Sequence, residues 1–272
     1  MLDILSSPYM IRTILAIIFI AVTAAFAGTY TVFRDISFLV AGTSHAALAG
    51  ASMALVLDTY AVVAGMNPMI GAVFFAVLLA MLAAYAGRHG DRESVNTAIG
   101  VGFGMSMSLA ILFISMIREY ASKAWSLLMG DNLLLTNQDR ILMGIMTAVI
   151  VTSSLLFHRQ FIFISFDMEG ASAYGISVSF YNYFMMLLIS LSVVVILKGV
   201  GAILVFAMLV APAAAASQIG RSVRTVMALA FLVALVAGLL GLFISFFFNV
   251  SPGAVASLLA TGFYFLLLAL KR

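Results

Sequence analysis

Long stretches without a charged residue dominate the chain and predict helices that cross a membrane. A hydrocarbon core of roughly 30 Å needs about twenty apolar residues in a helix. Stretches of that length or more lie between Arg12 and Arg34, Asp35 and Asp58, Asp58 and Arg88, Glu93 and Arg118, Glu169 and Lys198, Lys198 and Arg221, and Arg224 and Lys271. Each of them is long enough to span a bilayer.

These stretches are continuous in Leu, Ile, Val and Ala and do not alternate with polar residues. A membrane β-barrel shows that alternation, and in lipid the backbone groups of any other span must be satisfied within a helix. The sequence therefore predicts an all-α fold, a polytopic membrane helical bundle that forms a single domain over residues 1–272.

The pattern predicts eight to nine transmembrane helices. The interval 225–270 would form a helix of about 69 Å, twice the bilayer, so we expect a hairpin that turns at residues 249–253. The two spans beside Lys198 are alternatively one irregular element, which would leave eight. The nine expected spans are 11–33, 36–57, 61–87, 95–117, 139–157, 179–197, 199–217, 225–247 and 252–270.

Composition supports lipid as the solvent of this chain. Hydrophobic residues make up 65% and charged residues 8%, which leaves too little polar surface for a soluble globular domain. The net charge is only +3 and the basic residues occur singly, so we expect no nucleic-acid partner. Cysteine is absent, which excludes disulfides and thiolate metal sites.

The distribution of Lys and Arg predicts the orientation. One side collects eight basic residues: Arg34, Arg88, Arg92, Arg159, Arg221, Arg224, Lys271 and Arg272. The other collects five: Arg12, Arg118, Lys123, Arg140 and Lys198. The positive-inside rule puts the first group in the cytoplasm. We therefore expect a multi-pass protein of the plasma or inner membrane with a cytoplasmic C-terminus and, with nine spans, an external N-terminus.

Residues 158–178 form a cytoplasmic segment that is longer than a helix connection requires. Connections in helical bundles usually take two to eight residues. Asp167 and Glu169 favour the first turn of a short helix, and Gly175 suits its C-terminal cap. We expect a short helix along the membrane, either as a surface connector or as a docking element for a partner.

This segment resembles the coupling loop of bacterial-type ABC importer permeases, whose pattern is Glu-Ala-Ala, three residues, then Gly. Glu169, Ala171 and Gly175 follow that spacing, while Gly170 replaces the first alanine. The resemblance extends over almost the whole chain, to the permease subunits of divalent-metal ABC transporters for zinc, manganese and iron. It rests on the residues 44–50 (Ser-His-Ala-Ala-Leu-Ala-Gly), 166–176, 198–205 and 209–216.

The resemblance implies a homodimeric permease for a divalent cation, with zinc or manganese ahead of iron. It implies a cytoplasmic ATPase subunit and an external metal-binding protein as partners. Asp167, Glu169, Ala171 and Gly175 would then form the contact with the ATPase. No Gly-rich phosphate-binding pattern ending in Gly-Lys-Ser/Thr occurs, so we expect ATP hydrolysis on a separate chain, no catalytic residue and no cofactor bound here.

His45 is the candidate metal ligand. It lies about ten residues into its expected span, hence roughly 15 Å deep, and an imidazole suits zinc, manganese or iron. The family usually has an aspartate one turn earlier, where this chain has Ala41; the nearest oxygens are those of Thr43, Ser44 and Asp58. A dimer could present His45 twice, or the path could be a weak transit route. The alternative is a histidine that only hydrogen-bonds a neighbouring helix.

Two other classes of function remain open. A secondary transporter or ion channel without an ATPase would need paired carboxylates or a histidine–acid relay inside the spans. A structural membrane-assembly protein would leave the 158–178 segment unexplained. Lys198 and His158 are expected to have structural or interfacial roles.

Overall fold

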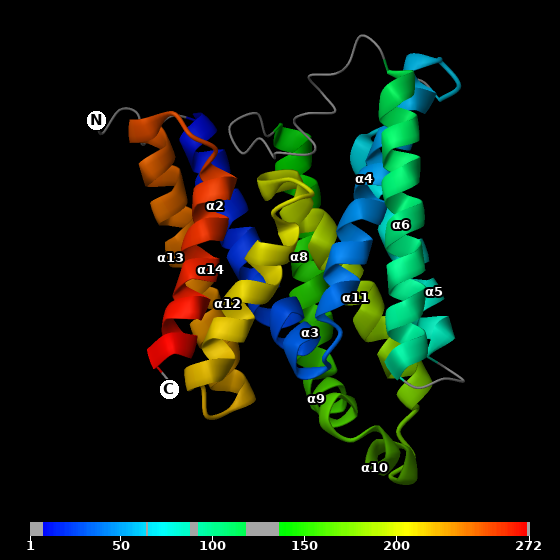
Figure 1. Ribbon diagram of the computed structural model, residues 1–272, viewed down its shortest axis with the longest axis vertical. Coiled ribbons are helices and arrows are strands. Elements are labelled where there is room, and N and C mark those ends of the chain that lie inside the picture. The colour runs from blue at the N-terminus through cyan, green and yellow to red at the C-terminus, as the bar shows by residue number, and fades with distance from the viewer. Residues whose placement is uncertain (1–7, 64, 88–91, 118–135, 271–272) are drawn as a thin grey trace.

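A computed structural model describes residues 8–63, 65–87, 92–117 and 136–270 of the chain. Within those ranges the regular elements are all helices and no strand occurs. Most of the helices run roughly side by side along the long axis of the molecule (Figure 1). The all-α prediction is confirmed.

In the part of the chain that the structure describes, eight helical runs are long and apolar enough to cross a membrane. The first combines α2 (Pro8–Thr23), η1 (Ala24–Gly28) and α3 (Thr29–Phe33). The others are α4 (Ser37–Thr59), α5 (Pro68–Ala86), α6 (Arg92–Met116), α8 (Asn137–Leu156), α11 (Val178–Val200), α13 (Val223–Phe248) and α14 (Pro252–Leu270). A ninth apolar helix, α12 (Val205–Ile219), is shorter and runs back antiparallel to α11 (Figure 1). This agrees with the expectation of eight to nine spans.

Three helix ends show where local chemistry decides the boundary. Helix α5 begins at Pro68 and not near residue 61, because the Asn67 side chain accepts a hydrogen bond from Met69 N at 2.9 Å and proline suits the first helical position. The expected break between two helices is present but lies after Lys198: α11 continues to Val200, and Gly201 ends it with φ +90°. The hairpin turn is confirmed, since Asn249 ends α13 with φ 52°.

Helix α4 lies at the centre of one half of the bundle, packed against α5 and α6. Its most apolar window is 83% buried, against 17% for α6, so α6 forms the rim. Small residues make this packing close: a Cβ on either Gly50 or Gly71 would collide with the carbonyl oxygen of the other. The backbones of α4 and α5 are therefore in direct contact.

Two short helices, α9 (His158–Phe166) and α10 (Met168–Ala173), project from one end of the bundle (Figure 1). Helix α14 ends on that side, and α2 begins on the opposite side (Figure 1). The helix at Asp167 to Gly175 was expected from the sequence, whereas α9 was not. Arg88, Arg118, Lys123, Lys271 and Arg272, which entered the charge count, lie outside the described residues.

Candidate functional site

His45 lies in the middle part of α4, eight residues after its first residue. The ring is half-buried and stands edge-on against Phe103 of α6, with 4.7 Å between the ring centroids and an angle of 89° between the planes. Its Nδ1 is buried and has no hydrogen-bond partner among the described residues. For Nδ1, the geometry therefore does not support the alternative that His45 hydrogen-bonds a neighbouring helix.

The oxygens closest to His45 along the chain are engaged elsewhere. The Thr43 hydroxyl donates to Leu39 O at 2.7 Å, and the Ser44 hydroxyl donates to Ala41 O at 2.9 Å, both within α4. Asp58, at the far end of the same helix, accepts from Gly65 N at 2.8 Å. Over the described part of the chain no group of three His, Cys, Asp or Glu residues is placed to hold a metal ion. The described part of this chain thus places no further ligand group beside the His45 imidazole.

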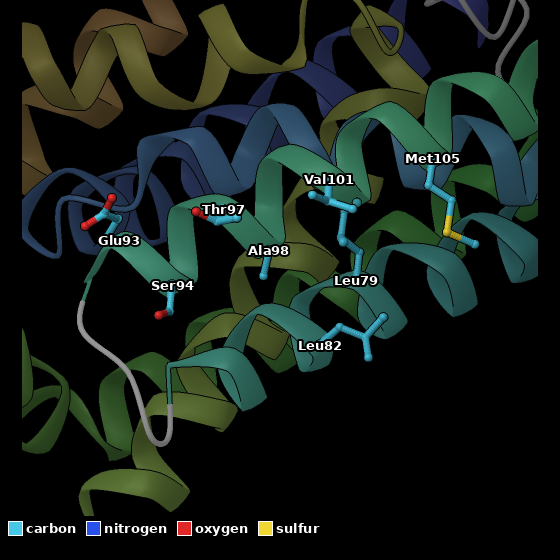
Figure 2. A pocket seen from close by; sticks show the side chains of 9 residues that line it. Leu79, Leu82, Glu93, Ser94, Thr97, Ala98, Val101 and Met105 are labelled. Atoms are coloured by element: carbon cyan, nitrogen blue, oxygen red, sulfur yellow. The ribbon is translucent and has the colours of Figure 1, made fainter.

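A groove on the outer face of α5 and α6 does not include His45. It has a volume of about 850 Å³, and Figure 2 shows Leu79 and Leu82 of α5 facing Val101 and Met105 of α6. Glu93, Ser94 and Thr97 lie together toward one end of it (Figure 2). The walls are otherwise apolar, which suits contact with lipid or another helix better than a metal site.

The four residues expected to contact an ATPase gather on and around α10. The Asp167 side chain caps the helix by accepting from Gly170 N at 2.8 Å, so Asp167 precedes the first turn and Glu169 lies within it. At the other end Ile176 N donates to Ala171 O at 3.0 Å, and Gly175 adopts φ +78°. This is the glycine-terminated cap that the sequence predicts.

The tip of this region presents apolar surface. Ala171 is fully buried and anchors α10, while Glu169 and Gly175 are exposed. Phe166 ends α9 and Tyr174 follows α10, and their side chains are 64% and 82% exposed. This end of the molecule therefore carries two exposed aromatic side chains.

An aromatic cluster connects α9 to the bundle. The Phe161 ring is fully buried and packs edge-on against Tyr30 of α3 at 5.4 Å and against Tyr181 of α11 at 6.3 Å. His158 begins α9, and its Nδ1 lies 3.1 Å from the Tyr30 hydroxyl. Burial, followed by the positive charge of Arg224, lowers the pKa of His158 below its ordinary value. His158 is thus part of a packed junction and not only an interfacial residue.

Sequence reasoning missed two polar contacts that fix helix ends. Lys198 Nζ lies 3.2 Å from Asp139 Oδ1 of α8, which agrees with the structural role expected of Lys198. The Arg34 guanidinium contacts both α9 and α11 through Ile164 O and Asn182 Oδ1, each at 3.1 Å. Both pairings join residues far apart in the sequence. In the sequence, these contacts were indicated by the positions of Lys198 and Arg34, which are charged residues beside long apolar stretches.

Known proteins resemble this chain over nearly its whole length. The manganese transport system membrane protein MntC of Listeria monocytogenes is 30% identical over 94% of this chain and 88% of its own. The manganese import system permease protein ScaB of Streptococcus gordonii is 32% identical over 89% of this chain and 84% of its own. Among solved structures, PsaBC from Streptococcus pneumoniae in complex with Fab aligns with a TM-score of 0.85 and 28% identity, covering 100% of this chain and 98% of that chain.

A family model also matches this chain over nearly its whole length. The model of the ABC 3 transport family matches residues 6–271, which includes α4 with His45 and the α9 and α10 region. Its described residues form eight helices long and apolar enough to span a membrane, and its fold is shared over its full length with a solved relative; this chain belongs to the ABC 3 transport family.

Proposed function

We propose that this chain is the transmembrane permease of an ABC importer that carries a divalent metal ion, with manganese as the cargo. The observation that carries the proposal is the full-length similarity to proteins named as manganese transport and import permeases. The similarity spans both the helix that bears His45 and the helices that project from the bundle. Zinc and iron remain the competing cargo ions of the test below.

ATP hydrolysis belongs to a separate subunit in this proposal. The chain has no Gly-rich phosphate-binding pattern, so it needs a partner that binds ATP. Helix α10 supplies a contact surface for it, with exposed Phe166 and Tyr174 at the tip and Glu169 at the side. A metal-binding protein delivers the ion at the opposite end of the bundle. This arrangement supports a cytoplasmic C-terminus, since α14 ends on the side of α10 (Figure 1).

His45 is the proposed metal contact within the path. Manganese accepts imidazole together with oxygen ligands, and the unpartnered Nδ1 offers one such donor. A second copy of the chain supplies the second imidazole, so that the path forms at a homodimer axis. A contact of one or two nitrogens is weak, which conduction requires, because an ion must leave its site as readily as it enters.

The test is metal uptake into vesicles that contain the permease with its ATPase subunit and the external binding protein. We expect manganese to accumulate only with ATP and binding protein present. Parallel assays with zinc and iron(II) identify the cargo. Uptake at the same rate without ATP would refute the importer and support a secondary transporter or channel. ATP-dependent uptake of zinc in preference to manganese would refute manganese as the cargo and would still support the ABC importer.

A further inference from the structure

Arg34 joins three elements that lie far apart in the sequence. It follows directly on α3, and its guanidinium donates through Nη1 to Ile164 O of α9 and through Nη2 to Asn182 Oδ1 of α11, each at 3.1 Å. Asn182 is 9% exposed, so the second acceptor is withdrawn from water. Charge-assisted hydrogen bonds in such surroundings are the strong ones.

The bond to Ile164 supplies what α9 lacks. Ile164 lies in the last turn of α9, where carbonyl groups have no partner within the helix and carry partial negative charge. That turn contains no basic residue of its own. The Arg34 cation therefore stabilises the C-terminal end of α9 from outside the helix.

Arg34 is also held close to the start of α4. Asp35 has φ +60°, a left-handed conformation that aspartate tolerates better than most residues. With it, Ile36 N donates to Thr31 O at 3.2 Å, and α4 begins at Ser37. On the other side, only Asp167 separates α9 from α10. Asp167, the bond from Arg34 to Ile164 O and the short link at Asp35 and Ile36 therefore connect α10 to the first turn of α4. The bond to Asn182 Oδ1 holds the guanidinium against α11.

We infer that Arg34 is the positioning residue that couples the movement of α9 and α10 to α4, and so ties ATP hydrolysis to passage of the metal at His45. The inference rests on the proposed function. A planar guanidinium holds two acceptors at a fixed angle, which a lysine ammonium does not. The aromatic contacts of Phe161 with Tyr30 and Tyr181 already pack these helices together. Loss of the Arg34 bonds should therefore loosen the coupling and leave the assembly intact.

The experiment measures metal imported per ATP hydrolysed in vesicles that hold the complete transporter. Arg34→Gln removes the guanidinium that makes both bonds, and Asn182→Leu removes the acceptor of one of them. Arg159→Gln removes an exposed cation from α9 and is the matched control. Because a charge-assisted hydrogen bond shifts an equilibrium by roughly tenfold, we expect the metal-to-ATP ratio to fall by about that factor in the first two variants. Arg159→Gln and Asn182→Asp, which keeps an acceptor for Arg34, should retain the parental ratio. Complex assembly should be parental in all four.

Two results would overturn the inference: a parental ratio in both Arg34→Gln and Asn182→Leu, or an equal loss of ratio in Asn182→Leu and Asn182→Asp. If Arg34→Gln is not inserted, the two Asn182 variants decide alone. Failure of the proposed function is distinguished by the parental protein, which would then show no ATP-dependent manganese uptake. If the cargo is another metal, the ratio is measured with that metal.

Discussion

Lys198 Nζ of α11 lies 3.2 Å from Asp139 Oδ1 of α8, so an ion pair joins the last turn of one spanning helix to the first turn of the other. Each charge also complements the dipole of its own helix end. Asp139 is 5% exposed, and Thr136 donates to its Oδ2 from both the backbone N–H and the hydroxyl. The carboxylate therefore depends on its partners and not on water.

Lys198→Met should lower the stability of the purified permease, because it leaves the Asp139 carboxylate buried without its cation. Breaking a buried pair costs about 3–5 kcal/mol, and the partial exposure of Lys198 reduces this to about 1–3 kcal/mol. Thermal unfolding in detergent measures the loss. The double variant Lys198→Met/Asp139→Asn should regain part of it; an unchanged unfolding temperature in Lys198→Met would show that the pair contributes nothing.

His45→Ala should abolish manganese uptake while the protein stays folded. Since Nδ1 has no hydrogen-bond partner among the described residues, the substitution loses mainly the edge contact with Phe103, worth about 0.5–1.5 kcal/mol. Phe103→Leu removes the same ring contact and keeps the imidazole, so it should retain uptake. Parental uptake by His45→Ala would assign the histidine to helix packing.

Ala41→Asp should make the path retain metal. The new carboxylate would lie one turn before His45 and add an oxygen ligand to the single nitrogen. We expect more manganese bound per purified complex and slower uptake, because a tighter site releases its ion less readily. Ala41→Asn, which lacks the charge, is the matched control. The prediction is wrong if metal content and uptake both stay at the parental values.

Gly175→Leu should uncouple ATP hydrolysis from transport. At φ +78° a residue with a Cβ costs about 1–2 kcal/mol, so the cap of α10 would rearrange. Nothing lies within 4 Å of a Cβ built at this position, so the effect comes from the backbone and not from crowding. Gly175→Asn, which tolerates this conformation, should keep the parental metal-to-ATP ratio. Normal coupling in Gly175→Leu would exclude α10 as the ATPase contact.

Stability should fall as the pH drops below about 6.5, and His158 should account for part of the fall. Its pKa in the folded protein is lowered by burial and then by Arg224, so the unfolded chain binds the proton more readily. The contribution of His158 to stability is fully present above its pKa in the unfolded chain. It is lost as the pH falls through its pKa in the folded protein. Unfolding temperatures of the parent and of His158→Gln across this range measure it. Identical pH profiles would contradict the assignment.

The spans were predictable because length without charge decides what crosses a bilayer. Their ends were less so. Residues 61–66 (Ala-Val-Val-Ala-Gly-Met) are apolar enough to extend α5, yet the Asn67 cap begins the helix later. Lys198 looked like a boundary, but a lysine in the last turn of α11 is satisfied by Asp139, and Gly201 provides the actual end.

The candidate site was predictable only where its signals are local. Asp167 and Gly175 mark the two ends of α10 within nine residues, and the structure has both caps. Arg34 contacts Ile164 and Asn182, which lie 130 and 148 positions later in the sequence. No periodic pattern of residues predicts contacts over such a separation. The environment of His45 likewise depends on α6, because Phe103 reaches its ring only after the two helices pack.

The contact between Gly50 and Gly71 limits how the transporter can change shape. With each carbonyl oxygen occupying the place of a methyl group on the other residue, α4 and α5 have no deformable side chain between them at this crossing. The two helices are expected to tilt as one rigid body, which removes a degree of freedom from the cycle. Any opening beside His45 must then come from the interface between α4 and α6, where side chains such as Phe103 can reorient.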